Sequence, residues 1–248
     1  MTLRAAVIAA TLAVVPFFGG NARADSDALW KIVHEHCVPA AEAGTGTGPC
    51  AAVDLERRFA VLKDLNGATQ FLVIPTDRIP GIESEAILAP GAPNYWEAAW
   101  QARRFMVKRA GKAVSRDEIS LAINSPHGRS QDQLHIHIDC IAPAVYEALR
   151  AESVILSPRW EPLPVALAGH RYRARRLDGE TLTANPFALL AEDGEAAAHM
   201  GDETLVVLGW EFADGEPGFI LLADRADVLA GDPASGEELQ DHDCAVLR

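Results

Sequence analysis

The sequence predicts an α+β protein, with an antiparallel sheet built from hairpins and covered by a few helices. Short apolar or alternating runs, which are typical of strands, come in pairs. Asn66-Gly67 lies between the two runs of the first pair, and this dipeptide is typical of a tight hairpin turn. A helix is predicted at residues 95–110, because Asn94 can cap it and its apolar side chains share one stripe. The four runs are residues 59–65, 70–74, 119–123 and 134–141.

The second half of the chain repeats this order of elements after a proline-rich turn at residues 157–164. We therefore expect two units, residues 25–150 and residues 151–248, with the second packed on the first. No residue-level repeat is visible, so this expectation depends on the order of elements alone. The later elements are a strand at 171–177, a helix at 186–200, and strands at 205–210 and 219–223.

Residues 1–24 have the composition of a secretory signal peptide. Arg4 precedes an apolar run at residues 5–18, and Ala22-Arg-Ala24 is a small-x-small cleavage site. The run is shorter than the roughly 20 residues that span a bilayer comfortably. We expect export to the periplasm and a mature chain that begins at Asp25, with an uncleaved inner-membrane anchor as the alternative.

The cysteines agree with export, because an even number of cysteines in an oxidising compartment predicts disulfide bonds. The chain has four cysteines, which permit three pairings. We expect Cys37 to pair with Cys50, because the glycine- and proline-rich segment between them would otherwise be floppy. Cys140 would then pair with Cys244, although two buried free thiols are the alternative.

The charge of the chain excludes one class of partner. Its formal net charge is −13, and residues 1–24 contribute two arginines and no acid. A protein with this much negative charge repels the phosphate backbone of a nucleic acid, and we therefore expect no nucleic-acid partner. An anionic small substrate remains compatible if its site is locally basic.

The strand at residues 134–141 carries the chemistry of the chain. His135, His137 and Asp139 alternate with apolar residues, so the three share one face. The two histidines could be a hydrogen-bonded structural pair. They could also bind a metal together with Asp139, since two imidazoles and a carboxylate form a common ligand set. Alternatively, one of them attacks phosphorus and carries the phosphoryl group.

The neighbouring residues favour the phosphorus chemistry. They offer neutral or cationic hydrogen-bond donors, and Gly128 lets backbone N–H groups come close to an anion. A metal site would instead collect further His, Cys or carboxylate ligands. We therefore expect a pyrophosphate site that requires no metal or other cofactor. The candidate donors are Asn124, Ser125, Arg129, Ser130, Gln131 and Gln133.

These residues resemble the histidine triad (HIT) superfamily of nucleotidyl hydrolases and transferases, and within it the CDP-diacylglycerol pyrophosphatase family. The likeness covers nearly the whole mature chain. It is carried by Asn124-Ser125, Arg129-Ser130-Gln131 and His135-Ile136-His137-Ile138, and by the separated blocks 61–67, 71–76, 99–103, 121–125, 169–170 and 241–244.

The resemblance implies a HIT-like fold in which the second half is a degenerate unit without a triad. It implies that His137 is the nucleophile and that His135 assists it. The third triad position is Asp139 where the superfamily has histidine, so Asp139 would orient His137 or bind the glycerol side of the substrate. The first hairpin would help to form the substrate pocket, with Lys63, Leu65 and Phe71 as candidates.

The reaction implied is hydrolysis of CDP-diacylglycerol to CMP and phosphatidate through a nucleotidyl-histidine. Its partners would be this nucleotide lipid and a membrane surface. The chain would be a monomer with an internal pseudo-dimer, or a homodimer. Two other functions remain open at this stage: a metal-dependent phosphoesterase that uses His135, His137 and Asp139, and a non-catalytic periplasmic nucleotide or lipid binder.

Overall fold

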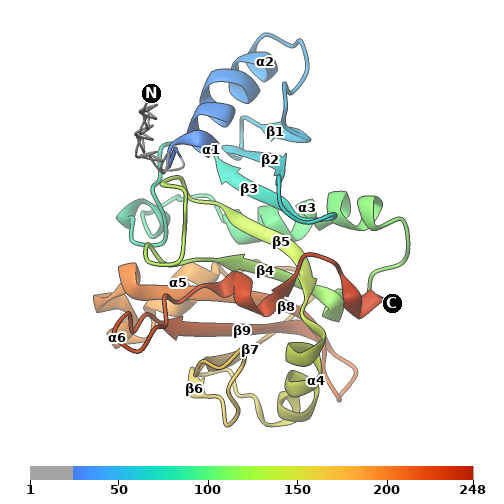
Figure 1. Cartoon of the computed structure of the whole chain (residues 1–248), viewed down its shortest axis with the longest axis vertical. Coiled ribbons are helices and arrows are strands. Elements are labelled where there is room, and N and C mark those ends of the chain that lie inside the picture. Colours follow the sequence, from blue (N-terminus) through green and yellow to red (C-terminus); the bar gives the residue numbers. More distant parts are fainter. Residues whose placement is uncertain (1–24, 248) are drawn as a thin grey trace, which may run out of the picture.

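The structure is a computed structural model that describes residues 25–247. Within these residues, ten strands form one antiparallel sheet in the order β1-β2-β3-β5-β4-β8-β9-β7-β6, and β10 pairs with β5 (Figure 1). The α+β class and the antiparallel sheet are thus confirmed. The strands are β1 (Ala52–Asp54), β2 (Phe59–Lys63), β3 (Phe71–Pro75), β4 (Ile119–Ile123), β5 (Ile136–Ile141), β6 (Glu161–Pro162), β7 (Arg173–Asp178), β8 (Glu203–Glu211), β9 (Pro217–Arg225) and β10 (Gln240–Asp241).

The two halves of the chain meet edge to edge, where β4 pairs with β8. On one side of this junction the strands run β4, β5, β3, β2, and on the other they run β8, β9, β7, β6. Counted outward from the junction, both series therefore have the same order: the third, fourth, second and first of their four strands along the chain. A helix, α3 (Tyr95–Ala110), separates β3 from β4, and two short helices, α5 (Pro186–Ala191) and α6 (Gly194–Ala198), separate β7 from β8.

One face of the sheet is covered by α3, α5 and α6. Their apolar side chains form a single large core with every second residue of the central strands. Trp96 and Trp100 of α3 are fully buried there and pack edge-on against Phe187 and Phe219. This continuous core holds the two halves of the sheet as one body.

The other face of the sheet carries two smaller cores. One lies under the N-terminal helical segment, which runs through α1 (Ala28–Lys31), the π-helix Ile32–Cys37 and α2 (Val38–Glu42). The other lies under α4 (Pro143–Glu152) and the segments around β6 and β7. The middle of the sheet, at β5 and β4, lies between the two cores, and several polar side chains are buried there, among them His137 and Asp139.

The predicted disulfide pairing is confirmed. Cys37 pairs with Cys50, which fastens the N-terminal helical segment to the start of β1, and Cys140 pairs with Cys244. All four cysteines lie within residues 25–247, and none is free. Disulfides persist in oxidising compartments, so the pairing indicates an exported protein.

The predicted signal segment, residues 1–24, lies outside the described residues. Among residues 25–247, no helix combines the length and apolar character that crossing a bilayer requires.

Candidate active site

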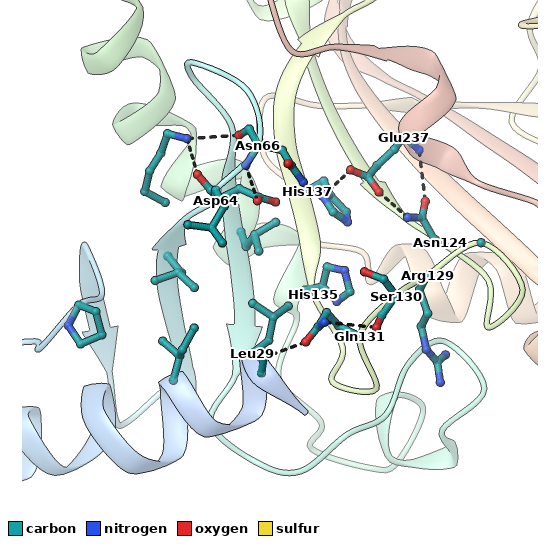
Figure 2. A pocket seen from close by; sticks show the side chains of 18 residues that line it. Leu29, Asp64, Asn66, Asn124, Arg129, Ser130, Gln131, His135, His137 and Glu237 are labelled. Carbon is teal, nitrogen blue, oxygen red and sulfur yellow. Dashed lines mark hydrogen bonds and ion pairs between the residues drawn. The ribbon is translucent and has the colours of Figure 1, made fainter. Parts of the chain in front are cut away.

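His137 of β5 and His135, which immediately precedes β5, project into a cavity of about 620 Å³ between the two smaller cores (Figure 2). β5 pairs with β3 on one side and β4 on the other, so its backbone is held rigidly. His137 lies opposite Leu72 of β3 and Ala122 of β4. The small Ala122 leaves room beside the imidazole for a segment from the C-terminal end of the chain.

That segment is the 3-10 helix Gly236–Leu239, which crosses the sheet beside His137. A Cβ at Gly236 would lie 2.8 Å from Val206 Cγ2, 2.9 Å from Thr204 Oγ1 and 3.3 Å from Ala122 Cβ. Only glycine therefore allows this close approach to the sheet. The approach brings Glu237 to the edge of the cavity.

Glu237 and Gln70 both lie against Nδ1 of His137. Nδ1 of His137 lies 3.1 Å from Oε1 of Glu237 and 3.2 Å from Nε2 of Gln70. The amide nitrogen of Gln70 is itself a donor, and it donates to the same carboxylate oxygen at 3.3 Å. When the proton of His137 is on Nδ1 it faces the Glu237 carboxylate, and the lone pair is then on Nε2.

Nε2 of His137 is buried and has no hydrogen-bond partner within residues 25–247. Burial, together with the neighbouring His135 and His242, holds the pKa of His137 well below the usual histidine value. The ring is thus neutral at physiological pH. An uncharged imidazole with a free, oriented nitrogen is a competent nucleophile.

Asn124 holds Glu237 in place. Its Nδ2 donates to Oε2 of Glu237 at 2.6 Å, and its Oδ1 accepts from the Glu237 N–H and the Ser235 hydroxyl, each at 3.2 Å. Asn124 lines the cavity as predicted, but its side chain is engaged with the carboxylate. Asn124 therefore acts on His137 indirectly, because it fixes the position of the Glu237 carboxylate.

His135 lies beside His137, with the ring centroids 4.7 Å apart and the rings edge to face. Its Nδ1–H donates to the backbone carbonyl of Gln133 at 2.6 Å, so Nε2 is the free nitrogen. Burial lowers the pKa of His135, so this ring is also neutral without a ligand. A bound phosphate would favour its protonated form and gain a donor there.

Most donors of the loop before β5 are used to hold the loop itself. The Ser125 hydroxyl donates to the Pro233 carbonyl, and the Gln133 amide donates to the carbonyls of Pro75 and Asp77. Neither Ser125 nor Gln133 lines the cavity. Both were predicted to bind substrate, and the structure instead engages both in fixing the loop.

Arg129 lines the cavity, but its charge is already balanced. Its guanidinium binds both carboxylate oxygens of Glu83, at 2.6 and 2.7 Å, and Oδ1 of Asp132 at 3.1 Å. Gln131 also lines the cavity, and its Oε1 accepts from the Leu29 N–H of α1. The Ser130 hydroxyl has no partner within residues 25–247 and is free for a ligand.

The far wall of the cavity is apolar. It is formed by the N-terminal helical segment and the first hairpin, with side chains from Ala28, Leu29, Ile32, Pro49, Leu62 and Leu72. Leu65 is fully exposed at the hairpin tip, at the mouth of the cavity. Lys63 lines the cavity too, and its Nζ donates to the carbonyls of Asp64 and Gly67.

Asp139 neither hydrogen-bonds to His137 nor lines the cavity. Its Oδ2 accepts from Nδ1 of His242 at 2.7 Å, and its Oδ1 accepts from the Thr69 hydroxyl at 2.9 Å. Within residues 25–247, His135, His137 and Asp139 do not bring ligand atoms within 4.8 Å of one another. The geometry therefore does not gather these three as a metal-ligand set.

Comparison with known proteins agrees with the resemblance drawn from the motifs. Residues 24–248 match the model of the family described as CDP-diacylglycerol pyrophosphatase. The chain belongs to this family. A CDP-diacylglycerol pyrophosphatase from Yersinia pestis is 46% identical over 225 residues, which cover 90% of this chain and 86% of that relative.

Membership of the CDP-diacylglycerol pyrophosphatase family extends over both halves of the sheet, since the match includes β6 to β9 and the C-terminal segment that carries Glu237. Glu237 was not among the site residues predicted from the sequence. The residues around Glu237 in the sequence form no motif that indicates a site. Its role depends on contacts with Gln70, Asn124 and His137, which are all far away in the chain.

Phe71 was predicted to contribute to the pocket of this family member, but it lies on the other face of the sheet. It is buried in the large core, where its ring contacts Phe105 of α3 with centroids 5.8 Å apart. The next residue, Leu72, lines the cavity instead, because successive side chains of a strand point to opposite faces.

Proposed function

We propose that this protein hydrolyses the pyrophosphate bond of CDP-diacylglycerol to CMP and phosphatidate, with His137 as the nucleophile. One observation carries the proposal: within residues 25–247, Nε2 of His137 has no hydrogen-bond partner, the ring lines the cavity, and Nδ1 lies 3.1 Å from the Glu237 carboxylate, which favours the proton on Nδ1. The substrate is that of the family to which the chain belongs and of its Yersinia pestis relative.

In the first step, Nε2 of His137 attacks the phosphorus that bears the cytidine, in line with the leaving phosphatidate. The new N–P bond forms as the bond to the bridging oxygen breaks, and that oxygen takes the electron pair. The imidazole becomes positively charged. Its Nδ1–H then faces the Glu237 carboxylate at 3.1 Å, which stabilises the charge as it develops.

The phosphoryl oxygens would lie near Nε2 of His135 and the Ser130 hydroxyl. These groups face the cavity and have no protein partner at those atoms within residues 25–247. In the second step, water attacks the same phosphorus and releases CMP, which restores the neutral His137. No step of this scheme uses a metal.

We infer that the second half is a degenerate HIT-like unit, so that one chain supplies an internal pseudo-dimer. The mirrored strand order on the two sides of the β4–β8 pair supports this. The cross-strand partners Ala122, Val206 and Leu222 place Leu222 of β9 on the same face as His137. An apolar side chain therefore occupies that face of β9, which would leave one active site in each chain.

We also infer that the protein works in the periplasm at a membrane surface. The apolar wall formed by Leu29, Ile32, Leu62 and Leu72 opens past the exposed Leu65, which suits a ligand with both nucleotide and lipid parts. Ala28 and Leu29 of α1, the first helix of the described chain, line this wall.

The test is to incubate the protein with CDP-diacylglycerol labelled in the CMP phosphate, quench rapidly without acid, and map the labelled peptide. We expect label on the peptide that contains His137 in the wild type, and no label or CMP release from His137→Ala. Binding without CMP release would indicate a non-catalytic lipid binder. Loss of activity with a chelator, and its return with added metal, would support a metal-dependent phosphoesterase.

A further inference from the structure

A second group of titratable side chains lies on the same face of the sheet as His137, on the far side of the segment that carries Glu237. Asp224 of β9 is two residues after Leu222, so it shares that face. His170, Asp224 and Asp232 each offer one ligand atom, and these three atoms lie within 4.8 Å of one another. None of the three lines the catalytic cavity.

The group holds more negative than positive charge. Nδ1 of His170 lies 2.8 and 2.9 Å from the two carboxylate oxygens of Glu238, and 3.7 Å from Oδ1 of Asp232. With Asp224, three carboxyl groups surround one imidazole. Within residues 25–247, no lysine or arginine side chain hydrogen-bonds to any of them, and the nearby Arg225 uses its guanidinium on Glu203 and Glu195.

Asp224 is the residue that the surrounding protein leaves unsatisfied. It is 7% exposed. Its Oδ1 accepts from the Arg225 N–H at 2.8 Å, but its buried Oδ2 has no partner within residues 25–247. Its carboxyl group contacts that of Asp232, and burial together with this neighbour raises the pKa of Asp224 to about 7. Two carboxyl groups in contact need a proton or a cation between them.

We propose that His170, Asp224 and Asp232 form a binding site for a divalent transition-metal ion such as Zn²⁺, with Glu238 beside it. One imidazole nitrogen and several carboxylate oxygens are the ligands that Zn²⁺ accepts. Ligands about 2 Å from a tetrahedral ion are about 3.5 Å apart, so the group would contract by at most about 1 Å to bind, and His170 Nδ1 and Asp232 Oδ1 are already 3.7 Å apart. The His170 side chain is 26% exposed, which gives the ion a path from solvent.

The ion would fix the segment that assembles the active site. This segment begins at Asp232 and continues through Pro233 and Ala234, whose carbonyls accept from the Ser125 hydroxyl at 2.6 Å and the Ser125 N–H at 3.0 Å. It then reaches Glu237, which orients His137. The metal would thus act by ordering this segment, far from the reacting phosphorus.

The test uses the full exported chain, dialysed against a chelator and titrated with ZnCl₂ by calorimetry, with metal content checked by elemental analysis. We expect one saturable site per chain. At free Zn²⁺ about 100 times the Kd, the Tm should rise by about 5 to 10 °C. Amide exchange in residues 232–238 should slow. These readouts do not depend on hydrolysis, so they can fail while the proposed function stands.

Three conservative variants locate the ion: Asp224→Asn, Asp232→Asn and His170→Gln. Each should weaken Zn²⁺ binding by at least tenfold while the circular dichroism spectrum stays that of the wild type. The control is His199→Gln, which removes an exposed histidine beside Asp202 in the same half of the chain. Binding that survives the three variants, binding lost in His199→Gln, or no saturable binding up to 1 mM would overturn the proposal.

Discussion

Replacing Glu237 by glutamine should disable His137 while leaving the fold intact. The carboxylate accepts from Asn124 at one oxygen and from Gln70 at the other, and this second oxygen also lies 3.1 Å from Nδ1 of His137. A glutamine has a single oxygen, so in either orientation its NH₂ group faces a donor. If that oxygen turns to Asn124, the NH₂ group faces Nδ1 of His137, which must then accept. The proton moves to Nε2, and the nucleophilic lone pair is lost.

The size of the effect follows from the hydrogen bond that is lost. A bond to a charged group contributes about 1.5–3 kcal/mol, and the imidazole of His137 is charged only as the reaction proceeds. At about 1.4 kcal/mol for each factor of ten, we expect kcat to fall by about 10- to 150-fold. KM should change little, because Glu237 contacts His137 and Asn124, with the substrate on the far side of the ring.

The assay is CMP release from CDP-diacylglycerol in mixed micelles, with thermal unfolding measured in parallel. Glu42→Gln is the matched control, because Glu42 is exposed at the end of α2 and should leave kcat unchanged. A Glu237→Gln variant with kcat within twofold of the wild type would refute the reasoning. So would a loss of activity that tracks a fall in Tm.

Three further predictions concern pH, the disulfides and Gly236. The neutral form of His137 is the reactive one, and its pKa is lowered. We therefore expect kcat/KM to rise with pH through a midpoint below about 6.5 and to be flat at higher pH. A midpoint at or above about 6.5 would contradict the role of His137 as the nucleophile. Replacing Cys140 and Cys244 by serine should lower the free energy of unfolding by about 4–5 kcal/mol, and replacing Cys37 and Cys50 should lower it by about 3 kcal/mol. The difference is expected because the Cys140–Cys244 disulfide closes the longer loop. Urea unfolding measures both values, and a larger loss for the Cys37–Cys50 pair would argue against loop entropy as the cause. Gly236→Ala should lower the free energy of unfolding by about 1–3 kcal/mol and reduce activity, because the new Cβ would contact Val206 and Thr204. Gly194→Ala is the control, because a Cβ at Gly194 has no neighbour within 4 Å. Equal unfolding midpoints for the two variants would show that residue 236 does not pack tightly against the sheet.

The catalytic strand could be predicted from the sequence because its signal is local. Alternation with a period of two follows from strand geometry alone, so His135 and His137 had to share a face. The same geometry separates Phe71 from Leu72, but it does not say which of the two faces the cavity. That depends on where α3 packs, which only the assembled fold determines.

The charge balance of the site could not be predicted in the same way. Arg129 is a natural phosphate ligand by residue type, yet Glu83, 46 positions earlier, already neutralises it. Glu237 lies 113 positions after Asn124, its hydrogen-bond partner, and nothing nearby in the sequence indicates that contact. Such long-range pairs decide which donors remain free for a ligand.

The position of Glu237 near the end of the chain affects when the protein can become active. β5 is synthesised well before the segment that completes it, and Cys140 can form its disulfide only once Cys244, 104 positions later in the chain, is in place. Until Glu237 packs against β5, His137 has no carboxylate at Nδ1. The complete site would thus form only when segments from both halves of the chain have packed together, and not with the synthesis of β5 alone.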